Sequence, residues 1–332
     1  MNENLNMQFD EISLLISQAK ENSILAVNVE LISLYWKIGE QVHLKVESSE
    51  WGKSIVSSLS EFIQQKEPGI RGFSSQNIWR MKQFYETYKD SPKLSALLRE
   101  LSWTNNLLII SKTKSIQEKE FYIKLTIQER YSSRELERQL DSALFERMLL
   151  SDKKLSAVLR EVHPKAEETF RDSYMLDFLS LPVIHSEKDL RKAIVGNLKQ
   201  FIIEFGKDFS FVGEEYRLQV GSKDFFVDLL FFHRELQCLV AIDLKITDFQ
   251  PEYLGKMEFY LEALDNIVKK SHEKPSVGII LCKNKDSKVV QYALNRSMSP
   301  TLIAKYETIL FDKSLLERKL DEFFQLEQDL EN

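Results

Sequence analysis

Three polar side chains lie inside two apolar runs in the second half of the chain, where strands are expected. The run 225–232 contains a single carboxylate, Asp228, among seven apolar residues. The run 239–246 contains Asp243 and Lys245, and because side chains alternate along a strand, these two are predicted to share one face. Burying a charge costs several kcal/mol unless the charge is paired or binds a metal. These three residues are therefore the first candidates for chemistry.

The spacing of the two runs brings the carboxylates together. A hairpin closed symmetrically about Glu235 and Leu236 would pair Asp228 directly with Asp243. Two like charges about 5 Å apart destabilise a sheet, and a divalent cation or, in part, Lys245 would offset the repulsion. Mg²⁺ prefers oxygen ligands, polarises a phosphoryl oxygen and lowers the pKa of a water. Lys245 would orient that water or stabilise charge that develops on the phosphate, so the pattern indicates a hydrolytic centre.

A second interpretation of the same residues needs no metal. A buried ion pair between Asp243 and Lys245, with Asp228 bonded to backbone groups, also satisfies the pattern. Both interpretations stay open at this point.

Two neighbouring positions could extend the site. Glu204 lies at the margin of a buried helical stripe, where it is either a further metal ligand or a surface glutamate. Lys256 and Tyr260 lie one turn apart on a later helix. They either face the site or, in the case of Tyr260, belong to the core.

Regular elements of alternating type position these residues in the second half of the chain. A helix opens at Ser186 with Asp189 as its capping partner and ends at Gly206. Three strands joined by short breaks follow, and such breaks force antiparallel hairpins. The predicted order is α-β-β-β-α-β-α-β, with strands at 209–220, 224–233, 237–246, 275–282 and 301–306, and helices at 251–270, 287–295 and the acidic C-terminus.

The first half of the chain shows helical periodicity throughout. One long helix is predicted over 9–45, and a second ends before the turn formed by residues 67–69. Ser74 or Ser75 then caps a third helix. This arrangement resembles a helix-turn-helix. The segment 71–99 holds six bases and two acids, so Arg71, Arg80 and Lys82 are candidates for phosphate contacts, although a basic solvated helix in a bundle fits equally well.

Composition excludes several classes of protein. The 332 residues carry a net charge of −6, which excludes a polybasic protein, although nucleic-acid binding depends on where the charges lie. Two cysteines in apolar runs predict buried thiols in a reducing compartment, and five scattered histidines do not support a zinc site. Without a signal-peptide pattern or an apolar run of about 20 residues, we expect a cytoplasmic protein with no membrane partner.

A helical domain at 1–150, a linker at 151–185 and a second domain at 186–332 are expected.

The second domain resembles the PD-(D/E)XK nuclease superfamily, and most of the chain is similar to the YhcG-like family of bacterial nucleases. The resemblance depends on motifs in both halves, which are Leu34-Tyr35-Trp36-Lys37-Ile38-Gly39, Trp51-Gly52-Lys53, Gly72-Phe73-Ser74, Phe226-Val227-Asp228-Leu229, Ile242-Asp243-Leu244-Lys245 and Gly278-Ile279-Ile280-Leu281-Cys282. It implies an α+β protein in which a helical domain precedes a restriction-endonuclease-like α-β-β-β-α-β core with a mixed central sheet.

The resemblance also implies roles for individual residues. Asp228, Asp243 and Lys245 match the catalytic positions, and Glu204 matches the helix acid that helps to hold the metal. Lys256 occupies a position where many members carry glutamine, and a lysine there could contact phosphate.

The leading hypothesis is a nuclease that uses Mg²⁺ or Mn²⁺ to hydrolyse phosphodiester bonds, with DNA favoured over RNA as substrate. The alternative is a non-catalytic nucleic-acid-binding protein or assembly subunit that retains the nuclease fold. A homodimer, or a subunit of a DNA-processing assembly, is a further expectation. The acidic C-terminal helix would then dock through Leu320, Phe323 and Phe324.

Overall fold

The computed structural model describes residues 2–48, 51–182, 184–310 and 313–320, and it describes side chains from residue 12 onward except that of residue 21. Within these limits the protein is of the α+β class. It divides into two compact units, Met1–Leu140 and Asp141–Asn332. Phe323 and Phe324, the predicted docking residues of the C-terminal helix, lie outside the described residues.

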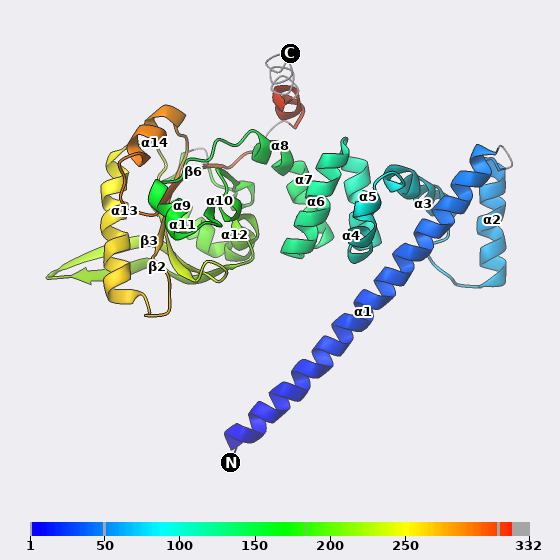
Figure 1. Ribbon diagram of the computed structural model, residues 1–332, viewed down its shortest axis with the longest axis horizontal. Coiled ribbons are helices and arrows are strands. Elements are labelled where there is room, and N and C mark those ends of the chain that lie inside the picture. Colours follow the sequence, from blue (N-terminus) through cyan, green and yellow to red (C-terminus); the bar gives the residue numbers. More distant parts are fainter. Residues whose placement is uncertain (1, 49–50, 183, 311–312, 321–332) are drawn as a thin grey trace. The chain divides into compact units, whose positions relative to one another are not determined.

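The first unit is helical, as predicted (Figure 1). Its long first helix is followed by a second that ends one residue before the predicted turn, and Ser74 caps the third by accepting a hydrogen bond from the backbone N–H of Asn77. Burial of one apolar stripe on each helix holds the unit together. The elements are α1 (Asn2–Glu47), α2 (Lys53–Lys66), α3 (Ser75–Tyr88), η1 (Pro92–Leu94), α4 (Ser95–Glu100), α5 (Trp103–Lys112), α6 (Ile116–Glu129) and α7 (Ser133–Asp141).

Helices α1 and α3 pack backbone to backbone at Gly39. A Cβ atom at this position would lie 2.2 Å from the carbonyl oxygen of Met81, which cannot move without displacing α3. We therefore expect Gly39→Ala to lower the free energy of unfolding of this unit by about 3 kcal/mol, the upper end of the usual overpacking cost. All four tryptophans of the chain precede residue 141, so urea unfolding followed by tryptophan fluorescence measures this unit. Gly52→Ala is the control because its Cβ would meet nothing within 4 Å, and an equal loss in both variants would contradict the prediction.

The second unit is built on a mixed six-stranded sheet with the strand order β1-β6-β5-β4-β3-β2. Strands β2, β3 and β4 are joined as antiparallel hairpins, whereas β4, β5, β6 and β1 run parallel to one another. The predicted strands and the mixed sheet are confirmed. Their bounds are β1 (Ser173–Met175), β2 (Phe209–Val220), β3 (Lys223–His233), β4 (Cys238–Leu244), β5 (Val277–Cys282) and β6 (Thr301–Glu307).

Helices cover both faces of this sheet, and an apolar cluster fills each interface. On one face Phe201 and Phe205 of α12 stack under the sheet, and on the other Met257 and Leu261 of α13 contact Gly278 of β5 closely enough to exclude a side chain there. Every residue of β4 and β5 is buried, which explains their near-continuous apolar sequence. The helices are α8 (Leu144–Leu149), α9 (Ala157–Val162), α10 (Ala166–Thr169), η2 (Asp177–Leu179), α11 (Glu187–Gly196), α12 (Leu198–Phe205), α13 (Glu252–Ala263), the π-turn η3 (Leu264–Val268) and α14 (Ser287–Leu294), and residues 313–320 are also helical.

Two predicted boundaries differ from the structure. The helix predicted from Ser186 to Gly206 is divided into α11 and α12 at Asn197, although Ser186 and Asp189 do form the expected capping box. Residues 151–185, predicted as a linker, instead belong to the second unit and supply β1. Phe170 and Tyr174 of this segment are fully buried, but isolated apolar residues in a polar stretch do not produce a strand pattern.

Two further expectations concern the cysteines and the membrane. Cys238 and Cys282 are both buried, as predicted, and burial raises the pKa of each thiol to about 12. Among the helices of the described residues, none combines the length and the apolar character that a membrane span requires.

Candidate active site

The two aspartates lie where β3 and β4 part. The ladder between these strands has the predicted register, and its last pair, Leu229 with Ile242, is adjacent to Asp228 and Asp243. Beyond that pair a side chain joins the two strands, because Asp228 Oδ2 accepts a hydrogen bond of 2.9 Å from the backbone N–H of Leu244. The hairpin therefore brings both carboxylates to the end of β4.

Two lysines hold the buried Asp243 carboxylate. Its side chain is 1% exposed, Oδ2 lies 2.7 Å from Lys245 Nζ, and Oδ1 accepts a hydrogen bond of 2.8 Å from Lys256 Nζ. Partial burial opposes the charge on Lys256, but the nearby Asp243 carboxylate outweighs it and raises the pKa of Lys256. Lys256 is contributed by α13, so this helix closes one side of the site.

An arginine holds Asp228 from the other side. Arg191 of α11 donates a hydrogen bond of 3.2 Å to Asp228 Oδ1, and it also lies 2.6 Å from a carboxylate oxygen of Glu215 on β2. Burial raises the pKa of Asp228 above its ordinary value of 3.8; the hydrogen bond from Leu244 opposes this shift, and the neighbouring charge of Asp243 adds to it. The surroundings of Asp228 thus disfavour the ionised form of this carboxylate.

The raised pKa of Asp228 predicts how stability depends on pH. Because the folded-state pKa lies above the unfolded one, the protonated form favours folding, and this contribution is lost as the pH rises through the folded pKa. We expect Asp228→Asn, which can still accept the Leu244 hydrogen bond, to raise the melting temperature of the metal-free protein at pH 7. In thermal melts, the difference in melting temperature between the variant and the wild type should disappear at acidic pH. A decrease in the melting temperature of the variant that does not depend on pH would contradict this explanation.

The charge balance of the group favours uptake of a cation. Four carboxylates, those of Asp228, Asp243, Glu187 and Glu215, stand against the three cations of Arg191, Lys245 and Lys256, which leaves one negative charge. Glu187 is contributed by the first turn of α11, with its carboxylate 3.7 Å from Lys245 Nζ. Oxygen donors in a group of net negative charge fit a hard divalent cation. The ion pair and the backbone hydrogen bond of the metal-free interpretation are also both present.

Glu204 is the predicted metal ligand that the structure places elsewhere. Its fully buried carboxylate accepts a hydrogen bond from the backbone N–H of Met175 on β1 and lies 3.5 Å from Arg171 and 3.7 Å from Arg147. Among the described residues, the two aspartates belong to no group of three possible metal ligands within 4.8 Å of one another, either with Glu204 or with another carboxylate. This carboxylate ties α12 to β1.

Tyr260 and Lys256 follow the sequence interpretation more closely. Lys256 reaches the site, and Tyr260, one turn later, donates a hydrogen bond of 2.7 Å to the backbone carbonyl of Phe226 in β3. Tyr260 is therefore both part of the core and a fixed neighbour of the aspartates.

The predicted nucleic-acid contacts of the helical unit lie on and before α3. Arg71 and Arg80 are exposed, whereas Lys82 is half-buried and bonded to Glu86 on its own helix. Residues 67–74 separate α2 from α3, a longer connection than the 3–4 residues of a typical helix-turn-helix. The DNA-contact role of this region stays a prediction.

Sequence reasoning missed Arg191, Glu187 and Glu215. Arg191 falls beside Leu190 and Ile194 on the buried stripe of α11, and a charge on such a stripe was an available signal. Glu187 is half-buried and Glu215 is exposed, and neither lies on an apolar stripe that would have given a comparable signal.

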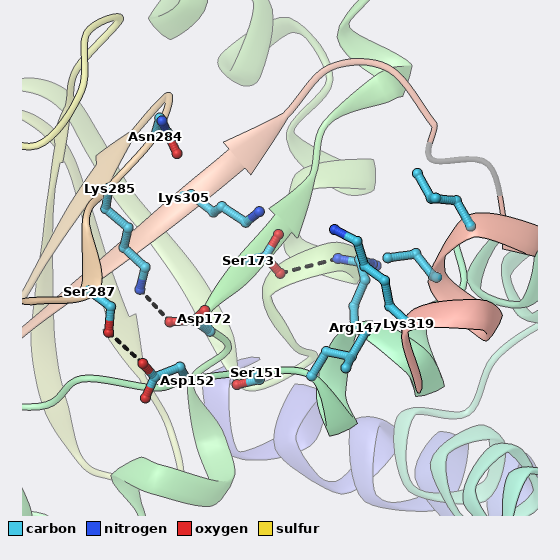
Figure 2. A pocket seen from close by; sticks show the side chains of 13 residues that line it. Arg147, Ser151, Asp152, Asp172, Ser173, Asn284, Lys285, Ser287, Lys305 and Lys319 are labelled. Atoms are coloured by element: carbon cyan, nitrogen blue, oxygen red, sulfur yellow. Dashed lines mark hydrogen bonds and ion pairs between the residues drawn. The ribbon is translucent and has the colours of Figure 1, made fainter. Parts of the chain in front are cut away.

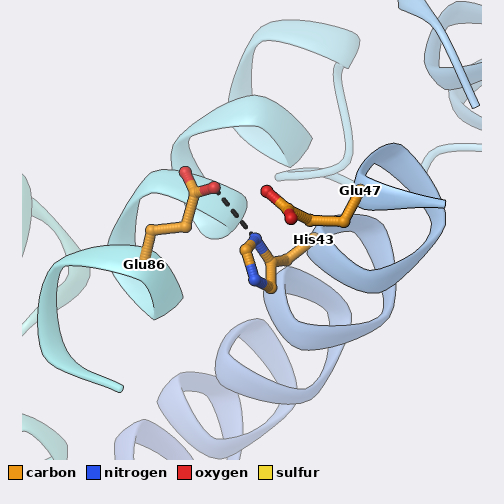
Figure 3. Close-up of side chains that lie close together, drawn as sticks. All are labelled: His43, Glu47 and Glu86. Atoms are coloured by element: carbon orange, nitrogen blue, oxygen red, sulfur yellow. Dashed lines mark hydrogen bonds and ion pairs between the residues drawn. The ribbon is translucent and has the colours of Figure 1, made fainter. Parts of the chain in front are cut away.

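A separate group of possible metal ligands lies in the helical unit. His43 and Glu47 of α1 and Glu86 of α3 have ligand atoms within 4.8 Å of one another, and Figure 3 shows the His43 ring close to both carboxylates, with its Nδ1 bonded to Glu86. Burial opposes ionisation of Glu86, but hydrogen bonds from Lys82 and His43 prevail and lower its pKa. Since Lys82 already neutralises Glu86 and His43 is hydrogen-bonded to it, we interpret the group as a polar network that joins α1 to α3.

Comparison with known proteins identifies the family. Family models match residues 167–321, described as the YhcG PDDEXK nuclease domain, and residues 11–147, described as the DUF1016 N-terminal domain. Over 94% of this chain and 92% of the relative, the sequence is 30% identical to "Putative nuclease YhcG" of Escherichia coli (strain K12). The chain belongs to the YhcG family. Its second unit is thus a PD-(D/E)XK nuclease-type domain, a class that generally uses divalent metal ions.

Among solved structures, a repair endonuclease from Pyrococcus abyssi is similar at 15% identity and a TM-score of 0.26. The match covers 39% of this chain and 49% of that one. A similarity at this level supports no conclusion about the YhcG-family chain.

Proposed function

We propose that this YhcG-family chain is a metal-dependent nuclease that hydrolyses phosphodiester bonds of DNA. The observation that supports the proposal most directly is the meeting of Asp228, Asp243 and Lys245 where β3 and β4 part, in a group with one excess negative charge. A cation in place of one lysine contact would offset the energetic cost of burying the Asp243 charge. It would also offset the repulsion between Asp243 and Asp228.

The roles of the side chains follow from their contacts. Asp228 and Asp243 would hold Mg²⁺ or Mn²⁺, and we propose Glu187 rather than Glu204 as the third carboxylate because Glu187 lies near Lys245. The bound cation would supply electrostatic stabilisation of the phosphoryl oxygen and activation of a water. Lys245, released from Asp243, would neutralise charge that develops on the phosphate.

Lys256 has a different place in the proposal. It is 44% exposed and bonded to the same carboxylate as Lys245. Because it can turn outward from Asp243 toward solvent, it is suited to contact a phosphate next to the one that is cleaved. Arg71, Arg80 and Lys82 of the helical unit are proposed as further contacts with the DNA backbone.

A non-catalytic nucleic-acid-binding role is the second candidate. The observation that favours it is that Arg191, Lys245 and Lys256 together already pair with both aspartates. In that case DNA binding would survive EDTA and no product would form even in Mn²⁺.

Cleavage of DNA and of RNA in Mg²⁺, Mn²⁺ and EDTA distinguishes the two candidates. The nuclease proposal expects product with either metal, none in EDTA, and faster cleavage of DNA than of RNA. Binding without product under every condition would favour the second candidate. We also propose a cytoplasmic location. We further propose assembly as a homodimer or as a subunit of a DNA-processing complex, and sedimentation of the protein with and without DNA would test this assembly.

A further inference from the structure

A polar pocket lies in the nuclease-type unit, and its lining includes neither of the two aspartates (Figure 2). Its volume is about 370 Å³, within the range of small-ligand sites. Its walls come from the ends of β5 and β6, the start of β1, α8 and the helical segment 313–320. The nuclease mechanism proposed above does not use this pocket.

Positive charge dominates the lining. Four cations, Arg147, Lys285, Lys305 and Lys319, face two carboxylates, so the lining carries two excess positive charges. Asp172 is hydrogen-bonded to Lys285 within the lining. Three lining residues pair with groups outside it: Asp152 lies 2.7 Å from Lys154, Arg147 lies 3.7 Å from Glu204, which Arg171 also contacts, and Lys305 lies 3.5 Å from Glu307. Counted with these partners, the excess is still two positive charges. A pocket of this charge favours an anion.

Two hydroxyl groups strengthen this conclusion. Ser151 Oγ and Ser173 Oγ are buried atoms of lining residues, and neither makes a hydrogen bond among the described residues. Buried polar atoms are almost always hydrogen-bonded in folded proteins. Hydroxyl donors beside guanidinium and ammonium groups are the set that recognises phosphate.

The volume of the pocket and its apolar residues limit the class of ligand that fits it. A bare phosphate would leave much of the volume unfilled, whereas Leu150, Leu315 and Leu316 provide an apolar wall for a sugar or a base. We propose that this pocket binds a nucleotide unit through its phosphate group. The unit is either a free nucleotide or part of a nucleic-acid strand.

The position of the pocket favours a strand that also reaches the active site. Because β4, β5 and β6 are parallel, their carboxyl ends share one edge of the sheet. The loops after β4 and β5 are joined there, since the backbone N–H of Phe249 donates to the carbonyl of Asn284. With strands about 4.8 Å apart, two or three strand positions span about 10–15 Å, a few nucleotides of a duplex at about 3.4 Å each. This part of the inference depends on the proposed nuclease function.

Binding without cleavage tests the proposal. We would titrate the full-length protein in EDTA with deoxyadenosine monophosphate, with deoxyadenosine, and with a short single-stranded oligonucleotide. The Lys305→Gln/Lys319→Gln double variant removes two cations that are not deeply buried. Lys288→Gln is the matched control because Lys288 is an exposed lysine on α14 outside the lining.

We expect the double variant to bind phosphate-bearing probes at least about tenfold more weakly, and Lys288→Gln to bind them like the wild type. Binding of the monophosphate indicates a free nucleotide, and binding of the oligonucleotide alone indicates a strand. Equal affinities in all three proteins, equal affinity for deoxyadenosine, or no binding of any probe would overturn the proposal. Circular dichroism would verify folding, and binding in the Asp243→Asn variant separates this result from any failure of the nuclease proposal.

Discussion

Replacement of Asp243 by asparagine is expected to reduce DNA cleavage in Mg²⁺ by at least about a thousandfold, to the limit of detection. Asp243 is the most deeply buried carboxylate of the group; it accepts a hydrogen bond from Lys256 and forms an ion pair with Lys245. Asparagine keeps the shape and one acceptor oxygen but removes the charge that a cation and two lysines share. A single electrostatic group at a reacting centre is typically worth about 10²–10³ in rate, and loss of the cation adds to this.

Single-turnover cleavage of a labelled duplex would measure the effect of Asp243→Asn. Its matched control is Asp224→Asn, an exposed carboxylate at the start of β3 that pairs with Arg217. The control should cleave at the wild-type rate. Cleavage by Asp243→Asn within about tenfold of the wild type, in a protein with an unchanged circular-dichroism spectrum, would exclude Asp243 from the reaction.

Replacement of Lys245 by alanine has the second largest expected effect, a decrease in cleavage of about 10²–10³-fold with binding of the cation retained. Lys245 is 8% exposed and contacts Asp243 at 2.7 Å. If it neutralises charge on the phosphate, its removal slows the chemical step. Because it also competes with a cation for Asp243, its removal should leave Mn²⁺ affinity unchanged or tighter.

The two readouts for Lys245→Ala are therefore opposed. If Lys245 had only a structural role, its replacement by alanine would impair folding, metal binding and cleavage together. Lys283→Ala serves as the control because Lys283 is exposed and lies just beyond β5. Weaker Mn²⁺ binding by a folded Lys245→Ala protein, with cleavage unchanged, would contradict the proposed role.

Much of the site could be predicted because local rules determine it. Short breaks force the hairpins, and a symmetric closure sets the register that brings Asp228 next to Asp243. The alternation of side chains along a strand likewise predicted that Asp243 and Lys245 share one face, and their charged atoms lie 2.7 Å apart. These features depend on residues that are close in sequence or on one strand pair.

Features that depend on packing between distant segments could not be predicted in this way. The arginines that hold Glu204 come from α8 and from the segment before β1, so its buried position is a tertiary property. The short strand β1 joins the sheet at its edge through β6, more than 120 residues later in the chain. Three residues are too few for a periodic pattern.

The metal dependence of the site is tested most directly by calorimetric titration of Mn²⁺ into the wild type, Asp228→Asn and Glu86→Gln, the last of which controls for the histidine–glutamate group of the helical unit. The nuclease account predicts a binding event that is lost in Asp228→Asn and kept in Glu86→Gln, together with weaker binding as the pH falls toward the raised pKa of Asp228. Identical titration curves for the wild type and Asp228→Asn would contradict it.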